Sequence, residues 1–155
     1  MAAKPWQDKR VVIVDDSATV REELKHAFQA CGVQVVGMAA DGAIGLELVR
    51  KHQPELVSLD LIMPEMDGVE CYRKIQELDP TIKCIIITWI GAEPKILENL
   101  SDKMPAHLFQ VKPVTARELE ARLDKIYFPQ PQLVKNRSTL DEEPEVLMDL
   151  GIKVS

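Results

Sequence analysis

The sequence predicts an α/β protein whose core is a doubly wound, five-stranded parallel sheet with helices on both faces. Short apolar runs alternate with amphipathic stretches of helical period over the first 128 residues. Strands that alternate with helices through right-handed crossovers form a parallel sheet. Several of the apolar runs also end in a carboxylate or a hydroxyl. Because open α/β sheets bind ligands at the carboxyl ends of their strands, a functional site is expected at that edge.

Five apolar segments bounded by Gly, Pro or Asp are the expected strands. They cover residues 10–15, 34–40, 56–60, 83–88 and 107–111. The run Ile85-Ile86-Ile87 has no polar alternation, which is typical of a strand that is buried on both faces. The common order of five such strands is 2-1-3-4-5, which places the first and third strands side by side. The carboxylates that end them, Asp15, Asp16 and Asp60, are then expected to converge.

Five helices are expected between and after these strands, because apolar residues there recur at helical spacing. The core-facing positions lie within residues 20–31, 44–49, 69–75, 96–104 and 119–126. Ser17 is expected to cap the first helix and Gly32 to end it. Asp67 and Gly68 are interpreted as turn and helix-start residues.

The pattern defines one folded domain over residues 8–128, followed by a Pro/Gln linker and a short C-terminal tail over residues 129–155. A short helix at 143–150 is expected within this tail, but it cannot fold alone. A chain of 155 residues with 46% hydrophobic residues can close one core, and it leaves no room for a second domain of ordinary size.

Composition narrows the class of protein. A net charge of -6 without clustered Lys and Arg argues against a general nucleic-acid surface. Cys31, Cys71 and Cys84 lie within apolar patterns and are odd in number, so we expect reduced thiols. The N-terminus carries no signal-peptide pattern, and no apolar run reaches the roughly 18 residues of a spanning helix. A cytoplasmic protein without membrane insertion is expected.

The converging carboxylates permit a specific chemistry. Three like charges at close range need a cation, and oxygen ligands of this kind favour Mg²⁺. Lys112 follows the fifth strand and Thr88 ends the fourth, so both can contact a phosphoryl group in the same crevice. Asp60 is then a candidate nucleophile that forms an aspartyl-phosphate.

These residues together resemble a known family. The pair Asp15-Asp16, Asp60 with the following Met63-Pro64 and Asp67-Gly68, Thr88, and Lys112-Pro113 are similar to the motifs of the receiver domain of two-component response regulators, the CheY-like family. The resemblance covers about residues 8–128. It implies the flavodoxin/CheY-like strand order given above, which is therefore carried over from the family as well as expected for five strands.

The resemblance implies a role for each motif residue. Asp60 would accept the phosphoryl group, and Asp15, Asp16, Asp60 and the backbone carbonyl of Ile62 would hold Mg²⁺, or Mn²⁺ in its place, with Asp15 acting largely through water. Thr88 and Phe109 would form a switch pair, in which the hydroxyl approaches the phosphoryl group and the ring turns inward. The Lys112-Pro113 peptide bond would be cis.

The function implied is a stand-alone response regulator in a phosphorelay, such as those of chemotaxis. A sensor histidine kinase or phosphotransfer protein would donate to Asp60, and a downstream protein would bind the fourth helix, fifth strand and fifth helix. The domain would not be an ordinary enzyme, although it would catalyse its own phosphorylation and act as a weak autophosphatase. It would be a monomer or a phosphorylation-dependent dimer.

Three apolar residues depart from the family pattern beside this site. Trp89 stands where a small residue is usual, so it is expected either to slow gain and loss of the phosphoryl group or to pack aside as an ordinary aromatic. Ile62 and Ile90 stand where polar residues can orient an attacking water, which predicts slow autodephosphorylation.

Two alternatives remain. The chain could be a phosphorylation-independent protein-binding module whose site Trp89 obstructs. It could also be an enzyme of the same topology: a flavodoxin would need a glycine- and hydroxyl-rich phosphate loop in place of Asp15-Asp16, and a dehalogenase-type phosphatase would prefer an acid in place of Ile62.

Overall fold

A computed structural model of the chain describes residues 3–63, 66–89, 105 and 108–129. Five parallel strands form one sheet in the order β2-β1-β3-β4-β5, which confirms the predicted fold class and strand order. The strands are β1 (Arg10–Val14), β2 (Gln34–Ala39), β3 (Leu56–Leu59), β4 (Lys83–Thr88) and β5 (Phe109–Val111).

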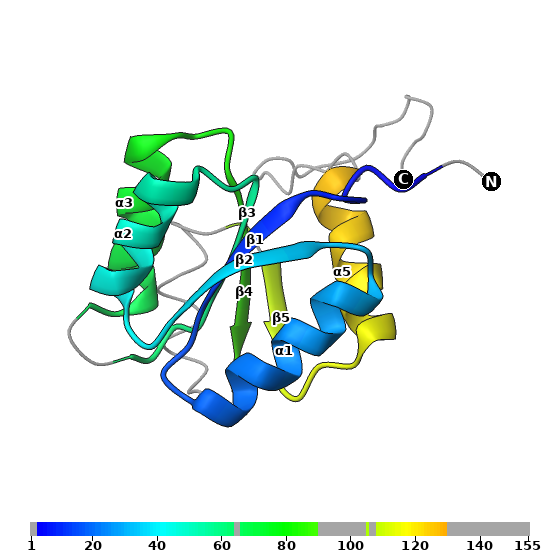
Figure 1. The fold of residues 1–155 in the computed structure, drawn as a ribbon, viewed down its shortest axis with the longest axis horizontal. Helices are drawn as coiled ribbons and strands as arrows, with labels where there is room; N and C mark the ends of the chain where they lie inside the picture. Colours follow the sequence, from blue (N-terminus) through cyan, green and yellow to red (C-terminus); the bar gives the residue numbers. More distant parts are fainter. Residues whose placement is uncertain (1–2, 64–65, 90–104, 106–107, 130–155) are drawn as a thin grey trace, which may run out of the picture.

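Helices cover both faces of this sheet. In Figure 1, α1 (Ala18–Ala30) and α5 (Ala116–Tyr127) lie together on one side of the sheet, and α2 (Gly42–His52) and α3 (Gly68–Leu78) lie together on the other. The helix expected within residues 96–104 and the tail over residues 130–155 lie outside the described residues. No helix of the described part is both long and apolar enough to cross a bilayer.

The helix ends follow the predicted capping chemistry. The Ser17 side chain accepts a hydrogen bond from the Val20 amide at the start of α1. Gly32 lies just beyond the end of α1 with φ at 87°, a left-handed conformation that glycine adopts without strain. Asp67 caps α3 by accepting from the Glu70 amide, and Gly68 is the first residue of that helix. These local signals therefore placed the ends of α1 and the start of α3 correctly.

Four strands are shorter at one end than predicted, among them β2, which ends at Ala39 in place of residue 40. β1 ends at Val14 and β3 at Leu59, one residue before the carboxylates that the sequence pattern included. The chain turns at these carboxylates, although the Asp15 and Asp60 amides still donate to the neighbouring strands. β5 begins at Phe109, because Leu108 belongs to a turn in which its amide donates to Pro105. Asp15 and Asp60 consequently start the loops that leave β1 and β3 at the edge of the sheet.

The core is built from the strands. Every residue of β3 and all but the first residue of β1 and β4 are buried, as expected for strands covered on both faces. Cys71 and Cys84 are buried free thiols and Cys31 is a partly buried one. Burial raises the pKa of Cys71 and Cys84 to about 12, so both remain protonated and unreactive at neutral pH.

Trp6 is part of this core, although the sequence pattern places the start of the domain at residue 8. Its side chain is fully buried, and its ring centroid lies 6.0 Å from that of Tyr127 at the end of α5. The Asp8 amide donates to the Gly32 carbonyl and fixes the turn that carries Trp6. The indole Nε1 has no hydrogen-bond partner among the described residues. The segment before β1 therefore closes the core beside α5.

Replacing Trp6 should destabilise the domain. Trp6→Ala is expected to lower the free energy of unfolding by roughly 3–5 kcal/mol, the range for removing a buried aromatic ring. Trp6→Phe should lose much less, because it keeps a ring against Tyr127 and removes an unpaired buried N–H. Urea unfolding followed by far-ultraviolet circular dichroism measures both. Equal stability of Trp6→Ala and the parent chain would show that Trp6 does not pack in this core.

Candidate functional site

Three carboxylates meet at the carboxyl edge of the sheet. Asp15 and Asp16 follow β1, and Asp60 follows β3, which pairs with β1. One carboxylate oxygen of each residue lies within 4.8 Å of the others. Asp15 and Asp60 are buried, whereas Asp16 is exposed. The predicted convergence of the three carboxylates is therefore present in the structure.

Lys112 enters this acidic crevice from the end of β5. Its Nζ lies 2.6 Å from Asp15 Oδ2 as an ion pair, and it donates a 3.0 Å hydrogen bond to Asp60 Oδ2. The side chain is 3% exposed, and the peptide bond that joins it to Pro113 is cis, as the family resemblance implies. One buried ammonium thus partly neutralises two buried carboxylates.

Backbone contacts hold Asp15 in place. Its Oδ1 accepts a 2.9 Å hydrogen bond from the Ser17 amide, and its carbonyl accepts a 2.6 Å hydrogen bond from Arg21 Nη1 of α1. Among the described residues, its buried Oδ2 has no hydrogen-bond partner, and the Lys112 ammonium lies 2.6 Å from it as an ion pair. The ammonium of Lys112 is therefore the group that offsets the charge of this oxygen in the described part of the chain.

The donor set fits a hard divalent cation. Three carboxylates within 4.8 Å of one another, one of them with an oxygen that lacks a hydrogen bond, offer the oxygen ligands that Mg²⁺ prefers. Among the described residues, Lys112 is the cation ion-paired with two of these three carboxylates, so a divalent cation would relieve the remaining repulsion. The residues present are therefore compatible with the metal site predicted at Asp15, Asp16 and Asp60.

The environment of Asp60 alters its acidity. Burial raises the pKa of the Asp60 carboxyl above its ordinary value, while the hydrogen bond and charge of Lys112 lower it and the charge of Asp15 raises it. Burial is the largest of these effects. Folding therefore disfavours the ionised form of the Asp60 carboxyl relative to the protonated form. A further positive charge nearby would favour the ionised form.

The loop after Asp60 packs closely over α3. A Cβ atom added to Gly68 would lie 2.2 Å from the Asp60 carbonyl oxygen and 2.7 Å from Leu61 Cα, closer than atoms can approach. The Gly68 amide donates to the Leu61 carbonyl. Gly68 thus starts α3 and also lets the backbone of the Asp60 loop pass directly against it. The Asp-Gly pair was the sequence signal, but only the structure shows this close approach.

The predicted switch residues lie on adjacent strands. Thr88 is buried as the last residue of β4, and its carbonyl accepts a hydrogen bond from the Lys112 amide. Phe109 begins β5, pairs with Ile86 and packs partly buried against the core. Thr88 and Phe109 therefore lie on the neighbouring strands β4 and β5. Their action as a switch stays a prediction.

Two of the residues assigned to access are exposed beside the crevice. Ile62 is 63% exposed and its amide donates a long, 3.4 Å hydrogen bond to Asp60 Oδ1. Trp89 is 56% exposed, and its ring lies over the ammonium of Lys112. The third, Ile90, lies outside the described residues. The roles of the Ile62 carbonyl and of all three side chains remain predictions.

Comparison with known proteins identifies the class. The family model for the response regulator receiver domain matches residues 11–124. Chemotaxis protein CheY of Thermotoga maritima is 34% identical over 118 residues, which cover 76% of this chain and 97% of that protein. CheY of Bacillus subtilis is 35% identical over 113 residues, which cover 72% of this chain and 92% of that protein.

A solved structure has the same fold. The CheX-CheY-BeF3-Mg complex from Borrelia burgdorferi contains a chain that is 29% identical and superposes with a TM-score of 0.68, covering 78% of this chain and 90% of that one. The chain described here belongs to the response regulator receiver domain family. It is a signalling domain of the CheY type, in which phosphoryl acceptance on an aspartate is the defining reaction.

The raised pKa of Asp60 predicts a pH-dependent stability. The folded state holds the Asp60 proton more tightly than the unfolded state, so stability is lost as pH rises through the folded pKa. Asp60→Asn should therefore be more stable than the parent chain at neutral pH in EDTA, and the gain should shrink as pH falls and the parent Asp60 becomes protonated. Urea unfolding across a pH series measures this.

Asp79→Asn is a control that makes the same change in charge but is expected to change the stability in the opposite direction. Hydrogen bonds from Thr81 lower the pKa of Asp79, so its ionised form stabilises the fold above its unfolded pKa. Asp79→Asn should lose stability at neutral pH. A gain for Asp60→Asn that is independent of pH would contradict the burial assigned to Asp60.

Proposed function

We propose that the chain is a stand-alone response regulator that accepts a phosphoryl group on Asp60 from a sensor histidine kinase or phosphotransfer protein. The observation that carries this proposal is the buried Asp60 carboxylate, which is hydrogen-bonded to Lys112 beside two further carboxylates at the sheet edge. Its relatives support the stand-alone part, because the match spans nearly the whole length of two CheY proteins. By the same relationship, chemotaxis is the pathway proposed first.

In the proposed reaction, an oxygen of Asp60 attacks the phosphorus of the donor. The bond from phosphorus to the donor histidine nitrogen breaks, and an acyl phosphate forms on Asp60. The Lys112 ammonium, held 3.0 Å from Asp60 Oδ2, is placed to neutralise a phosphoryl oxygen, and the Thr88 hydroxyl would donate to another. Catalysis would thus come largely from the receiver, which would also hydrolyse its own acyl phosphate weakly.

The proposed metal ligands are Asp15, Asp16, Asp60 and the carbonyl of Ile62. When bound there, Mg²⁺, or Mn²⁺ in its place, would neutralise charge on the phosphoryl group. Asp15 is already oriented for this by the Ser17 amide and by Arg21. The protein's own contribution is to hold the carboxylates at one edge before any ligand arrives.

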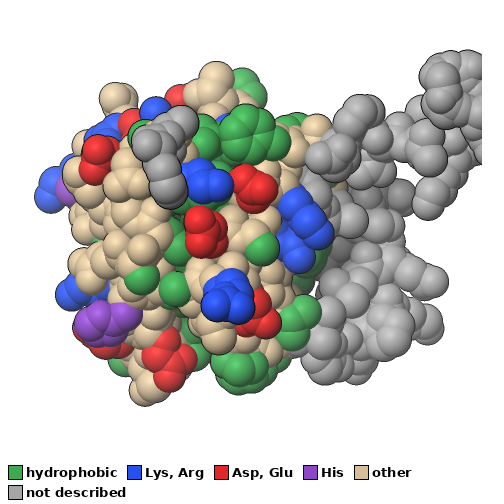
Figure 2. Space-filling model, turned by 90° about the vertical axis from the view of Figure 1, so that its right-hand side faces the viewer, with side chains coloured by type: hydrophobic (Ala, Val, Ile, Leu, Met, Phe, Trp, Pro, Cys, Tyr) green, Lys and Arg blue, Asp and Glu red, His purple; other side chains and the backbone are tan. Residues whose placement is uncertain are grey.

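The output is proposed to be a change in protein contacts. Thr88 and Phe109 would couple the phosphoryl group to the surface formed by the expected fourth helix within residues 96–104, β5 and α5. On the side of α1 and α5, Figure 2 shows acidic and basic side chains interspersed with apolar ones, which favours a protein surface over a nucleic-acid backbone as the partner. The oligomeric state proposed is a monomer or a phosphorylation-dependent dimer in the cytoplasm.

A second candidate is a phosphorylation-independent binding module. It is favoured by one observation, the exposed indole of Trp89 beside the crevice, which could obstruct a phosphodonor. Under this alternative Asp60 is not labelled in the parent chain, and Trp89→Ala restores labelling. Under the first proposal Trp89 slows the gain and loss of the phosphoryl group without preventing either.

Incubation with acetyl phosphate separates the two candidates. The parent chain should be labelled in MgCl₂ and not in EDTA, and Asp60→Asn should abolish labelling because an amide cannot form the acyl phosphate. Asp41→Asn is the matched control, since Asp41 caps α2 and asparagine caps a helix equally well. Labelling retained in Asp60→Asn would overturn the assignment of Asp60.

The same label measures how slowly the phosphoryl group is lost. The apolar Ile62 predicts a long-lived acyl phosphate, because no polar side chain at this position orients water. Ile62→Asn, alone or with Ile90→Glu, should shorten the half-life of the label. An unchanged half-life would remove the role proposed for these apolar residues.

A further inference from the structure

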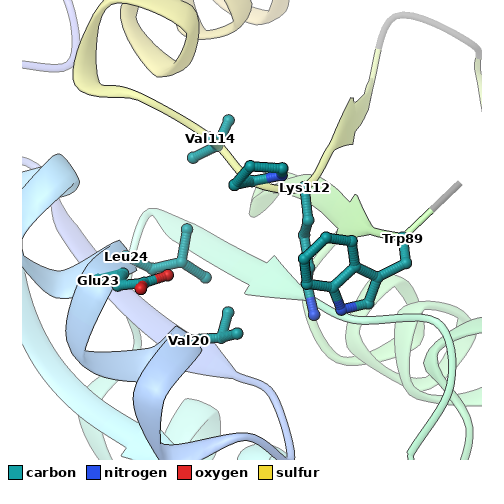
Figure 3. A pocket seen from close by; sticks show the side chains of 7 residues that line it. Val20, Glu23, Leu24, Trp89, Lys112 and Val114 are labelled. Carbon is teal, nitrogen blue, oxygen red and sulfur yellow. The ribbon is translucent and has the colours of Figure 1, made fainter.

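Trp89 and Lys112 form a pair that the proposed reaction does not use. The Lys112 ammonium lies 5.7 Å from the centroid of the Trp89 ring, within the distance of a cation–π interaction. Figure 3 shows the lysine side chain running beside the indole, across a small pocket from Val20 and Leu24 of α1. Of the two residues, only Trp89 is accessible to solvent, since it is 56% exposed and Lys112 is buried.

Three groups therefore act on one ammonium. Asp15 Oδ2 and Asp60 Oδ2 attract its charge at 2.6 and 3.0 Å, and the negative face of the indole attracts it from the pocket side. At a partly exposed site, such a ring contact changes an equilibrium by about two- to fivefold. The ring thus favours the arrangement in which the ammonium rests on the carboxylates.

We propose that Trp89 is a positioning residue whose ring holds the Lys112 ammonium on Asp15 and Asp60, and that it thereby weakens the binding of a divalent cation to the same carboxylates. This inference rests on the metal site of the proposed function. It assigns the effect of Trp89 to charge placement, which is distinct from obstruction of a phosphodonor.

The reason is a competition between two cations for the same carboxylates. Lys112 is ion-paired with Asp15 and Asp60, and both residues belong to the carboxylate cluster that fits the divalent cation. An ammonium and a divalent cation on the same carboxylates repel each other, so cation binding disfavours the present position of Lys112. Any contact that stabilises that position lowers the affinity for the cation, by at most the factor by which it stabilises the position.

Mg²⁺ binding without a phosphodonor tests the proposal. Isothermal calorimetry with MgCl₂ at constant ionic strength gives the dissociation constant of each variant. Trp89→Leu keeps an apolar side chain but removes the π face, so it should bind Mg²⁺ about two- to fivefold more tightly than the parent chain. Trp89→Phe should lie between them, because a phenyl ring attracts a cation less strongly than an indole does.

A double-mutant cycle assigns the effect to the ammonium. In a Lys112→Met background no cation lies under the ring, so Trp89→Leu should leave the Mg²⁺ affinity unchanged. Circular dichroism checks that each variant is folded, which is expected for a substitution at the exposed Trp89.

Each other result overturns the inference. Equal or weaker Mg²⁺ binding by Trp89→Leu contradicts the competition, and the same change with and without Lys112 assigns the effect to ring bulk. If neither the parent chain nor any variant binds Mg²⁺, both the proposed metal site and this inference are contradicted. Labelling of Asp60 by acetyl phosphate is measured separately. A failure of the proposed function is therefore distinguished from a failure of the inference about Trp89.

Discussion

The ion pair between Lys112 and the two buried carboxylates is the interaction on which the site depends. Asp15 and Asp60 are buried at the sheet edge, where unpaired charges are strongly disfavoured, and the ammonium contacts both at 2.6 and 3.0 Å. One positive charge among three carboxylates leaves an excess of negative charge, which a cation would neutralise. The ion pair thus allows the two carboxylates to be buried, and the remaining negative charge favours the binding of a cation.

The fold brings the charged residues of this site together. The strand order places β1 beside β3, and Lys112 reaches across from the end of β5. Gly68 lets the Asp60 loop lie against α3, and Arg21 ties the Asp15 carbonyl to α1. Trp89 then lies over the ammonium from outside. Contacts from both helical layers therefore converge on one charge cluster.

Much of this could be predicted from the sequence, because the signals are local and periodic. Apolar runs gave the strands, and the polar residues after them marked the edge where the crevice lies. Three features needed the structure. Trp6 joins the core through a contact with Tyr127, far away in sequence, and no periodicity signals it. The contacts of Gly68 with Asp60 and of Trp89 with Lys112 depend on how loops meet in space, which spacing along the chain does not encode.

The most direct measurement of the central claim is to locate the acyl phosphate chemically. Borohydride reduces an aspartyl-phosphate to homoserine, so treatment of the phosphorylated chain followed by peptide mass spectrometry identifies the modified residue. The account predicts conversion at Asp60 alone, in Mg²⁺ and not in EDTA. Conversion at Asp15 or Asp16, or none in a folded chain with Mg²⁺ and a phosphodonor, would contradict it.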